Sequence, residues 1–362
     1  MAPTPPAPPP ARGVRVGIVG AGLAGAACAR ALADAGCAVE VFDKSRGLGG
    51  RMATRRAAWA REGGSPQAAS FDHGVPWWTA QSPEFNAFLA GAQASGLVRR
   101  WAPRIVPAQG APLSPGPEGW VAVPDMPAVC RTLLGGIEVH AGRAVTALSF
   151  QEGRWQLHSE GEPLAEGLDA VVLAIPPVQA AVLWEPHLPQ WAREPQDHPM
   201  SPCWTLMALT DEPELGDAAR HLPWDEMWPA DPPLARVIRQ DAKPGRPRVP
   251  GVAQWVLHAQ AGWSHAHLEA APQEVLPVLQ RALEHALGTG LKWHHAVVHR
   301  WRYAQRLPQA LGTQPALAAD RTMCAWDPLC GLGACGEHLA AGGVEAAWAS
   351  GRELARVMLQ SP

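Results

Sequence analysis

The stretch Val14–Asp43, VRVGIVGAGLAGAACARALADAGCAVEVFD, decides the fold of this chain. A short apolar run ends in glycine, a segment of helix-forming residues follows, and AVEVFD then alternates in polarity as a strand does. This order predicts a βαβ unit in which the glycines of GAGLAG lie at the first strand-to-helix turn.

The glycines of that turn, Gly20, Gly22 and Gly25, form a GxGxxG pattern. Gly20 permits the tight turn, Gly22 lets a pyrophosphate approach the backbone, and Gly25 lets the helix pack close to the strand. Asp43 ends the second strand, where a carboxylate accepts hydrogen bonds from ribose hydroxyls and repels a 2′-phosphate. Strand, helix, strand and acid in this order favour a dinucleotide site over a merely tight turn.

The run KSRGLGGRMATRR after Asp43 favours FAD over a nicotinamide cofactor. Because FAD needs its long ribityl chain held beyond the first turn, Gly49, Gly50 and Arg51 are expected to place backbone and a guanidinium near the diphosphate. Lys44 follows the ribose acid and is assigned to the adenosine end. A solvated basic face is the alternative for the arginines of this run.

Composition narrows the class of protein. With 47% hydrophobic and 17% charged residues among 362, the chain is globular. A net charge of -3 gives no basic field for nucleic acid or for a membrane surface, and no apolar run is long enough to span a bilayer. Seven cysteines without a CxxC pair indicate reduced thiols and a cytoplasmic location. Monomer and dimer are both left open.

The predicted fold class is α/β: a Rossmann-type FAD-binding domain with a parallel sheet, and a discontinuous substrate domain built on a mainly antiparallel sheet plus helices. The middle of the chain is rich in Pro and Trp and differs from its flanks, whereas the last section reads as a return to the first domain. We expect a disordered Pro-rich tail over residues 1–12, the FAD-binding domain over 13–70, 135–185 and 315–362, and the substrate domain over 71–134 and 186–314.

Local signals predict further elements. Ser82-Pro83-Glu84 is typical of a helix start, so we expect a helix over Pro83–Gln93, and a second one near Pro277–Leu287. Strand-like runs are Trp120–Val123, Ile137–His140, Trp155–His158, Ala170–Ile175, Trp204–Leu209, Gln254–His258 and Ala296–Tyr303.

The sequence resembles the flavoproteins of the amine oxidase superfamily and, within it, the renalase family, chiefly its bacterial members. The resemblance rests on blocks in family order along nearly the whole chain: GAGLAG, DKSRGLGGRMATRR, FDHG at Phe71–Gly74, DAVVLAIPPVQA at Asp169–Ala180, VHRWRYA at Val298–Ala304, and ACGEHLAAGGVEAAWASG at Ala334–Gly351. The last block, with FDHG and VHRWRYA, makes the narrower assignment specific.

The resemblance implies further cofactor contacts. Gly74 closes FDHG, and Gly336 with Glu337 stands where the family usually has Gly-Asp, whose acid bonds the ribityl chain. Gly343, Val344 and Glu345 open a helix whose N-terminus would be aimed at the flavin pyrimidine edge, where its dipole stabilises negative charge on the reduced ring. A plain first-turn acid is the alternative for Glu345. FAD is expected to be non-covalent, because no Cys or His matches an attachment position.

One departure concerns the segment after FDHG. The family commonly has Ala-Gln and two aromatic residues there, whereas this chain has Val75-Pro76-Trp77-Trp78, so any role of that glutamine is lost. For His73 two roles stay open, facing the flavin or forming structural hydrogen bonds.

The resemblance also implies a reaction. Renalase-like enzymes oxidise the 2- and 6-dihydro isomers of NAD(P)H by hydride transfer to flavin N5, with oxygen as the acceptor. This reaction needs a binding site that holds two flat rings face to face, and it needs little general acid or base catalysis. The candidate residues for that site are His258, Trp301 and Tyr303, and core packing is the alternative role for each. A flavin amine oxidase or desaturase and a non-catalytic redox sensor are the competing functions.

The lysine and histidine residues bear on the choice among these functions. Amine oxidases commonly place a lysine beside flavin N5, and of the three lysines only Lys292 is a plausible one here, since Lys243 lies in the loop-like DAKPGRP. The histidines near 258–299 invite a zinc site, but neither HExxH nor HxxEH occurs, so no metal is predicted.

Overall fold

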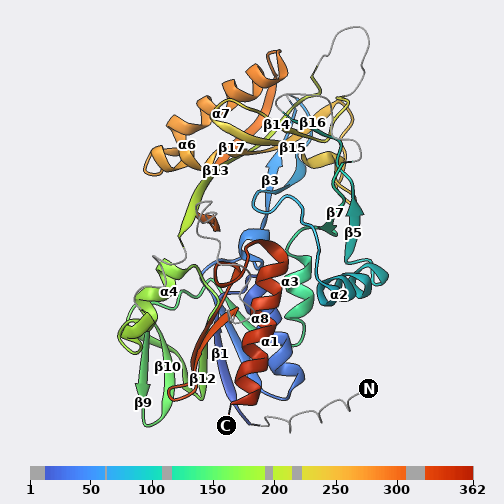
Figure 1. Ribbon diagram of the computed structural model, residues 1–362. Helices are drawn as coiled ribbons and strands as arrows, with labels where there is room; N and C mark the ends of the chain where they lie inside the picture. Colours follow the sequence, from blue (N-terminus) through green and yellow to red (C-terminus); the bar gives the residue numbers. More distant parts are fainter. Residues whose placement is uncertain are drawn as a thin grey trace, which may run out of the picture. The chain divides into compact units, whose positions relative to one another are not determined.

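The computed structural model describes residues 13–61, 63–107, 116–191, 199–213, 222–306 and 323–361 (Figure 1). The tail predicted over residues 1–12 lies outside the described residues. The chain divides into two compact units. Unit 1 comprises Met1–Gly50, Val129–Pro199 and Arg306–Pro362, and unit 2 comprises Arg51–Ala128 and Met200–Gln305.

Unit 1 is built on a six-stranded sheet with β1 near its centre. The order is β18-β19-β12-β1-β2-β8, parallel except for the edge strand β18. Its strands are β1 Arg15–Val19, β2 Ala38–Asp43, β8 Glu138–Ala141, β12 Ala170–Leu173, β18 Cys324–Asp327 and β19 Leu332–Cys335. The predicted βαβ unit is confirmed, since β1, helix α1 (Leu23–Asp34) and β2 follow one another and β1 pairs with β2 in parallel.

Helices cover this sheet. Helix α8 (Gly343–Gln360) runs beside α1 in Figure 1, and the two backbones come so close that a Cβ on Gly351 would lie 2.0 Å from the Ala24 carbonyl oxygen. A three-stranded antiparallel sheet of β9 (Ala147–Gln151), β10 (Arg154–Ser159) and β11 (Glu162–Leu168) packs with helix α4 (Pro177–Trp184) through a buried apolar cluster. The remaining elements are helix α3 Ala128–Leu133 and the 3-10 turns η2 Pro189–Trp191 and η4 Glu337–Leu339, and the 3-10 turn η1 Gly50–Met52 spans the boundary at which unit 2 begins.

Unit 2 is built on a second six-stranded sheet of order β17-β13-β16-β15-β14-β6. Strands β13, β16, β15 and β14 pair antiparallel, and β6 joins β14 in parallel, so the predicted mainly antiparallel sheet is confirmed. The strands are β6 Ile105–Pro107, β13 Met200–Asp211, β14 Glu226–Trp228, β15 Leu234–Arg239, β16 Val252–Ala259 and β17 Trp293–Arg306, with the 3-10 turn η3 (Gln240–Ala242) after β15.

The two faces of this sheet differ. One face packs apolar side chains such as Leu206, Val237 and Leu257 against helix α7 (Pro272–Leu287), and the short helix α6 (Ala261–Ala266) adjoins it. Because paired residues of antiparallel strands share a face, His258 lies on the opposite face together with Arg236. We call this second face, which also carries Glu226, the polar face.

The rest of unit 2 consists of hairpins and one helix. Strands β3 (Thr54–Trp59) and β4 (Gln67–Asp72) pair antiparallel, as do β5 (Val98–Trp101) and β7 (Gly119–Ala122). The predicted helix after Ser82 is confirmed as α2 (Pro83–Ala94), because the Ser82 hydroxyl accepts a hydrogen bond from the Phe85 amide. Among the described residues, the helices are all too short or too polar to cross a membrane.

The helix predicted near Pro277 begins one turn earlier than expected. Helix α7 starts at Pro272, and Pro277 lies inside it. Glu274 is responsible, since its carboxylate accepts from the Ala271 amide at 2.9 Å, while Pro272 occupies the first helical position, where no amide donor is needed.

Candidate functional site

Two glycines of the turn after β1, Gly20 and Gly25, are required by close backbone contacts, whereas a Cβ on Gly22 would meet only the Gly50 Cα at 4.0 Å. Gly20 has φ +112°, and a Cβ there would lie 2.5 Å from the Ala174 carbonyl oxygen. A Cβ on Gly25 would lie 2.0 Å from the Gly20 carbonyl oxygen, so the helix can start this close to the strand only with glycine at that position.

The loop after β2 lies against the same turn. The Gly49 amide donates to the Ala21 carbonyl at 3.0 Å, and a Cβ on Gly50, where φ is +53°, would come within 3.3 Å of the Gly22 Cα. Two glycine-containing segments therefore meet backbone to backbone at the N-terminus of α1. Such a place admits a diphosphate, because the glycines place no side chain there and the helix start carries partial positive charge.

Asp43 lies at the carboxyl end of β2, where the sequence predicts the ribose acid. One carboxylate oxygen accepts from the Ala21 amide at 2.8 Å and the other from the Ser45 amide at 2.7 Å. Each oxygen retains a further lone pair, so the carboxylate is fixed by backbone and can still accept from a ribose. Lys44 beside it is exposed.

A second group of predicted residues gathers between β19 and α8. Glu337 is only 5% exposed, and its carboxylate accepts from the amide of Gly343, the first residue of α8, at 2.7 Å. The Gly336 amide donates to the Ser350 hydroxyl at 2.8 Å. The longer acid is thus accommodated by folding back onto the helix start, which a shorter aspartate would reach less easily.

Val344 and Glu345 follow at the start of α8. Val344 is buried in the core, and Glu345 is half-buried in the first helical turn. The direct contacts to a flavin ring predicted for both residues stay predictions.

Unit 1 therefore fits the predicted FAD. Glycines stand where a Cβ would fill the diphosphate path, a fixed carboxylate ends the second strand, and the strands β1, β2, β12 and β19 all end at the same edge of the sheet. That edge is where open parallel sheets bind dinucleotides.

In unit 2, the FDHG segment begins with a buried ion cluster. Asp72 is 0% exposed and accepts from the Thr54 hydroxyl at 2.7 Å, from the Lys243 ammonium at 3.1 Å and from two nitrogens of Arg246 at 2.8 and 3.0 Å. Burial opposes its ionisation, but these cations outweigh burial and lower the pKa of Asp72 to about 2. The cluster fixes the end of β4 and the residue that follows it, His73.

Lys243 lies in a loop, as the segment DAKPGRP predicts, but its side chain is fully buried against Asp72. Burial lowers the pKa of Lys243 to about 8, although Asp72 acts in the opposite direction. The burial of Lys243 could not be predicted from polar and apolar periodicity, because Lys243 follows the short 3-10 turn η3 and does not lie in a helix or strand.

His73 brings two of the three predicted catalytic residues together. Its carbonyl accepts from Trp301 Nε1 at 3.1 Å and lies 3.3 Å from His258 Nε2, and its ring stacks on the indole of Trp301 with centroids 5.0 Å apart. His299 meets both rings edge-on, 4.9 Å from His73 and 4.5 Å from Trp301. We include the side chains of His73, His299 and Trp301 in the polar face.

These histidines are neutral. Burial is the main cause that lowers the pKa of His258 to about 3 and that of His73 to about 4, and it also lowers the pKa of His299. Arg236 lowers the pKa of His258 further. Tyr303, two residues beyond Trp301 on β17, is half-buried, and its predicted role stays untested.

Arg51 and Gly74, both predicted near the cofactor, lie together in unit 2. The Val75 amide donates to the Arg51 carbonyl at 2.8 Å, and a Cβ on Gly74 would be 1.9 Å from that oxygen. Arg51 also donates to the Ala304 carbonyl at 3.3 Å. Gly74 is therefore required for a backbone approach, whatever else it contacts.

Glu226 organises the other end of the polar face. It is completely buried and accepts from Trp77 Nε1 at 2.7 Å, from Trp228 Nε1 at 2.6 Å and from Arg236 Nε. The guanidinium of Arg236 also lies over the Trp77 ring, 5.6 Å from its centroid. The sequence did not single out any of these side chains for function, because they come from separate strands and from the segment after FDHG.

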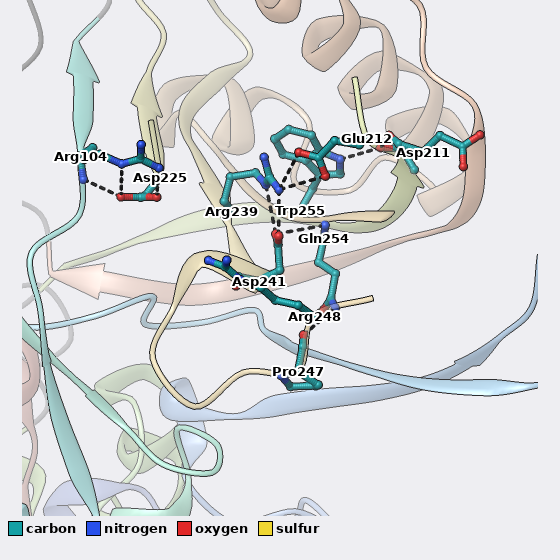
Figure 2. Close-up of polar contacts among 11 residues, drawn as sticks. Arg104, Asp211, Glu212, Asp225, Arg239, Asp241, Pro247, Arg248, Gln254 and Trp255 are labelled. Atoms are coloured by element: carbon teal, nitrogen blue, oxygen red, sulfur yellow. Dashed lines mark hydrogen bonds and ion pairs between the residues drawn. The ribbon is translucent and has the colours of Figure 1, made fainter. Parts of the chain in front are cut away.

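A neighbouring cluster, drawn in Figure 2, shows how such charges are neutralised. Arg239 forms two hydrogen bonds with Asp241 at 2.8 and 3.0 Å, approaches Glu212 at 3.1 Å, and lies over the ring of Trp255 at 5.2 Å. At the left of the same view, Arg104 holds Asp225 through two side-chain nitrogens.

The pattern is general for the described part of unit 2. Every buried carboxylate there is paired with an arginine. The pairs are Asp72 with Arg246, Asp125 with Arg56, Glu226 with Arg236, and Asp241 with Arg239.

The histidines of unit 2 do not gather as metal ligands within the described residues. The one group of three potential ligands there lies in unit 1 and consists of Glu40, Glu138 and His140, and Arg15 already pairs with Glu40 at 3.1 Å. His294 instead binds Asp211 at 2.8 Å.

Two protein-family models match this chain. A family model for NAD(P)-binding Rossmann-like domains matches residues 18–98, and a model for flavin containing amine oxidoreductases matches residues 101–359. The second match covers well over half of the chain.

Solved structures agree at the level of the fold. A protein assigned as a protoporphyrinogen oxidase from Exiguobacterium sp. 255-15 is similar with a TM-score of 0.68 and 13% identity, over 97% of this chain and 99% of that one. Putrescine oxidase bound to putrescine gives a TM-score of 0.64 and 15% identity over 95% and 99%. Cyclohexylamine oxidase from Brevibacterium oxydans IH-35A gives 0.57 and 14% over 96% and 99%.

Proposed function

This chain belongs to the family of flavin-containing amine oxidoreductases, and from that premise we propose that it is a renalase-like oxidase of 2- or 6-dihydro-NAD(P). It is an FAD-dependent oxidoreductase. The substrate is the part that needs an argument, because the family includes enzymes with chemically different substrates.

Unit 1 is proposed to hold FAD without a covalent bond. Gly20, Gly22 and Gly50 leave the diphosphate path open, and Asp43 is placed to accept from the adenosine ribose. Glu337 fixes the start of α8 by accepting from the Gly343 amide. When bound, FAD supplies the acceptor for two electrons and passes them on to oxygen.

The observation that carries the substrate assignment is the charge of the polar face. Its buried carboxylate, Glu226, and the buried Asp72 that precedes His73 are each already paired with cations, and its histidines are neutral. Arg236 keeps donors beyond the Nε that binds Glu226, and its side chain is 29% exposed. Such a face favours an electron-rich, anionic substrate over an ammonium ion, for which no unpaired buried carboxylate is available among the described residues of unit 2.

The proposed reaction does not require a general acid or a general base from the protein. A dihydropyridine that loses hydride recovers aromaticity, so no group has to remove a proton from it. The neutral His258 and the indole of Trp301 are held in place by the His73 carbonyl, which fixes the orientation of both rings. Their proposed role is to orient a flat ring and to exclude water from it.

The reaction balances as dihydro-NAD(P) plus O₂ plus one proton giving NAD(P)⁺ plus H₂O₂. The test is an aerobic incubation of the purified holoenzyme with each dihydronicotinamide isomer, in which NAD(P)⁺ and peroxide are both quantified. We expect equal amounts of the two products from at least one isomer. Peroxide formed with amines but with no isomer would refute the proposal.

Amine oxidation is the second candidate, because the family is named for it and because structures of similar fold include putrescine oxidase and cyclohexylamine oxidase. It predicts peroxide with small primary amines and an aldehyde or ketone as the organic product. The same incubation, with amines in place of the nicotinamides, distinguishes the two candidates.

A further inference from the structure

A cavity of about 490 Å³ opens on the polar face of unit 2, lined by Trp77, Trp228, Ala235 and Arg236. This volume lies within the range of about 300–1,000 Å³ that is usual for small-molecule sites. The lining combines two indoles with one guanidinium, whereas Glu226, the carboxylate to which all three donate, is completely buried.

Glu226 fixes the orientation of this lining. Both indole N–H groups donate to its two oxygens, Trp228 to one and Trp77 to the other, so the polar edge of each indole is consumed. Both indoles also line the cavity, and the Arg236 guanidinium lies over the Trp77 ring, 5.6 Å from its centroid. Arg236 gives only its Nε to Glu226, which leaves the terminal nitrogens, the part of a guanidinium that binds phosphate in pairs.

The ion pair of Arg236 with Glu226 and the Asp72 cluster together carry a net positive charge. Glu226 and Asp72 carry two negative charges, whereas Arg236, Lys243 and Arg246 carry three positive ones. Lys243 interacts electrostatically with Glu226 as well as with its partner Asp72. An anion placed at Arg236 would therefore not meet an uncompensated carboxylate.

We propose that this cavity binds the adenosine-phosphate part of a dinucleotide substrate, with the base against the indoles and a phosphate at Arg236. The proposal rests on the function proposed above and specifies where the non-reacting half of the substrate is held. Arg236 and His258 are paired across β15 and β16, so this subsite adjoins the residues assigned to the flat ring.

The experiment measures binding and not turnover. ADP-ribose, which contains the adenosine diphosphate but no nicotinamide, is titrated by calorimetry into the FAD-saturated enzyme. We expect Arg236→Gln to weaken binding at least about tenfold, the scale of losing charge-assisted hydrogen bonds. Inorganic phosphate and adenosine should each bind more weakly than AMP, since each uses only half of the site.

Arg100→Gln is the matched control. Arg100 also lies over an indole, that of Trp120 at 4.7 Å, and also pairs with a carboxylate, Glu118 at 3.2 Å, but it does not line the cavity. ADP-ribose affinity should stay within about twofold of wild type in this variant, as for an ordinary exposed pair.

Two substitutions keep the test valid if Arg236→Gln folds poorly. Trp228→Leu removes the ring while the pair of Glu226 and Arg236 stays, so it should weaken the binding of AMP but not the binding of phosphate. Trp228→Phe keeps a ring and should bind AMP nearly as wild type does. Equal affinity of wild type, Arg236→Gln and Trp228→Leu for ADP-ribose would overturn the subsite, even if dihydronicotinamides are oxidised. Loss of affinity in these variants without oxidation of any dihydronicotinamide would keep the subsite and refute the function.

Discussion

Replacement of Asp72 by asparagine removes the one negative charge that Lys243 and Arg246 share inside unit 2. The lowering of the Asp72 pKa from 3.8 to about 2 corresponds to about 2 kcal/mol in favour of the ionised form in the folded state. The variant also leaves two buried cations without their partner, and breaking a buried pair in this way costs about 3–5 kcal/mol. We therefore expect Asp72→Asn to lower the free energy of unfolding by at least about 3 kcal/mol.

Urea unfolding at pH 7 measures this change, with Asp225→Asn as the control. Asp225 pairs with Arg104, whose side chain is 59% exposed, so its loss should cost about 1 kcal/mol or less. The wild type should also lose the Asp72 contribution as the pH falls from 3.8 toward 2, whereas Asp72→Asn should not. Equal destabilisation by both substitutions would show that burial of the Asp72 cluster makes no difference to its contribution.

Four shorter predictions follow from the same contacts. Asp43→Ala should weaken FAD binding by about 1–3 kcal/mol, measured by flavin release on dilution, and unchanged affinity would move the ribose elsewhere. Lys292→Met should leave anaerobic flavin reduction within a few-fold of wild type, and a loss of several hundredfold would favour amine oxidation. Pro76→Gln should raise the rate with at least one dihydronicotinamide isomer, and no change with any would remove this position from the substrate site. The pKa of His258 is about 3 in the folded state and about 6.5 when the chain is unfolded, so protonation of the unfolded chain should lower the free energy of unfolding as the pH drops below 6.5. The loss should reach about 2 kcal/mol at pH 5, and His258→Gln should abolish that part of the pH dependence.

The first unit could be predicted from the sequence because its signals are local. The glycine turn, the helix after it and the acid at the end of β2 lie within thirty consecutive residues, Val14–Asp43, and Gly20 and Gly25 are required by backbone contacts that the pattern implies. Asp43 was expected to bind ribose, but its bonds to the Ala21 and Ser45 amides were not foreseen, because they depend on how the turn and the next loop fold back together.

The polar face of unit 2 could be predicted only in part. Trp301 came from a short block of resemblance and His258 from the search for residues that could line a slot for flat rings, whereas their common partner, the His73 carbonyl, is a backbone atom that no residue type reveals. Glu226 and Arg236 come from neighbouring strands that pair through tertiary structure, so no spacing along the chain identifies them.

Lys243 shows the same limit for charge. Its neighbours Pro244 and Gly245 are typical of an exposed turn, and Gly245 does adopt φ +75°. The turn nevertheless packs closely against Val123, and its lysine is buried against Asp72. Composition predicted the loop correctly but not its burial, because burial depends on a partner that lies far away in the sequence.

We propose that the polar face selects a dihydronicotinamide and not an amine. The most direct measurement is the rate of anaerobic flavin reduction in a stopped-flow instrument, with 2- and 6-dihydro-NAD(P) compared with putrescine and cyclohexylamine at equal concentration. Because an ammonium ion would face Arg236 without an unpaired carboxylate, a difference of several kcal/mol is expected, and at least one dihydronicotinamide should reduce the flavin about a hundredfold faster than either amine. Faster reduction by an amine, with no reduction by any dihydronicotinamide, would contradict the account.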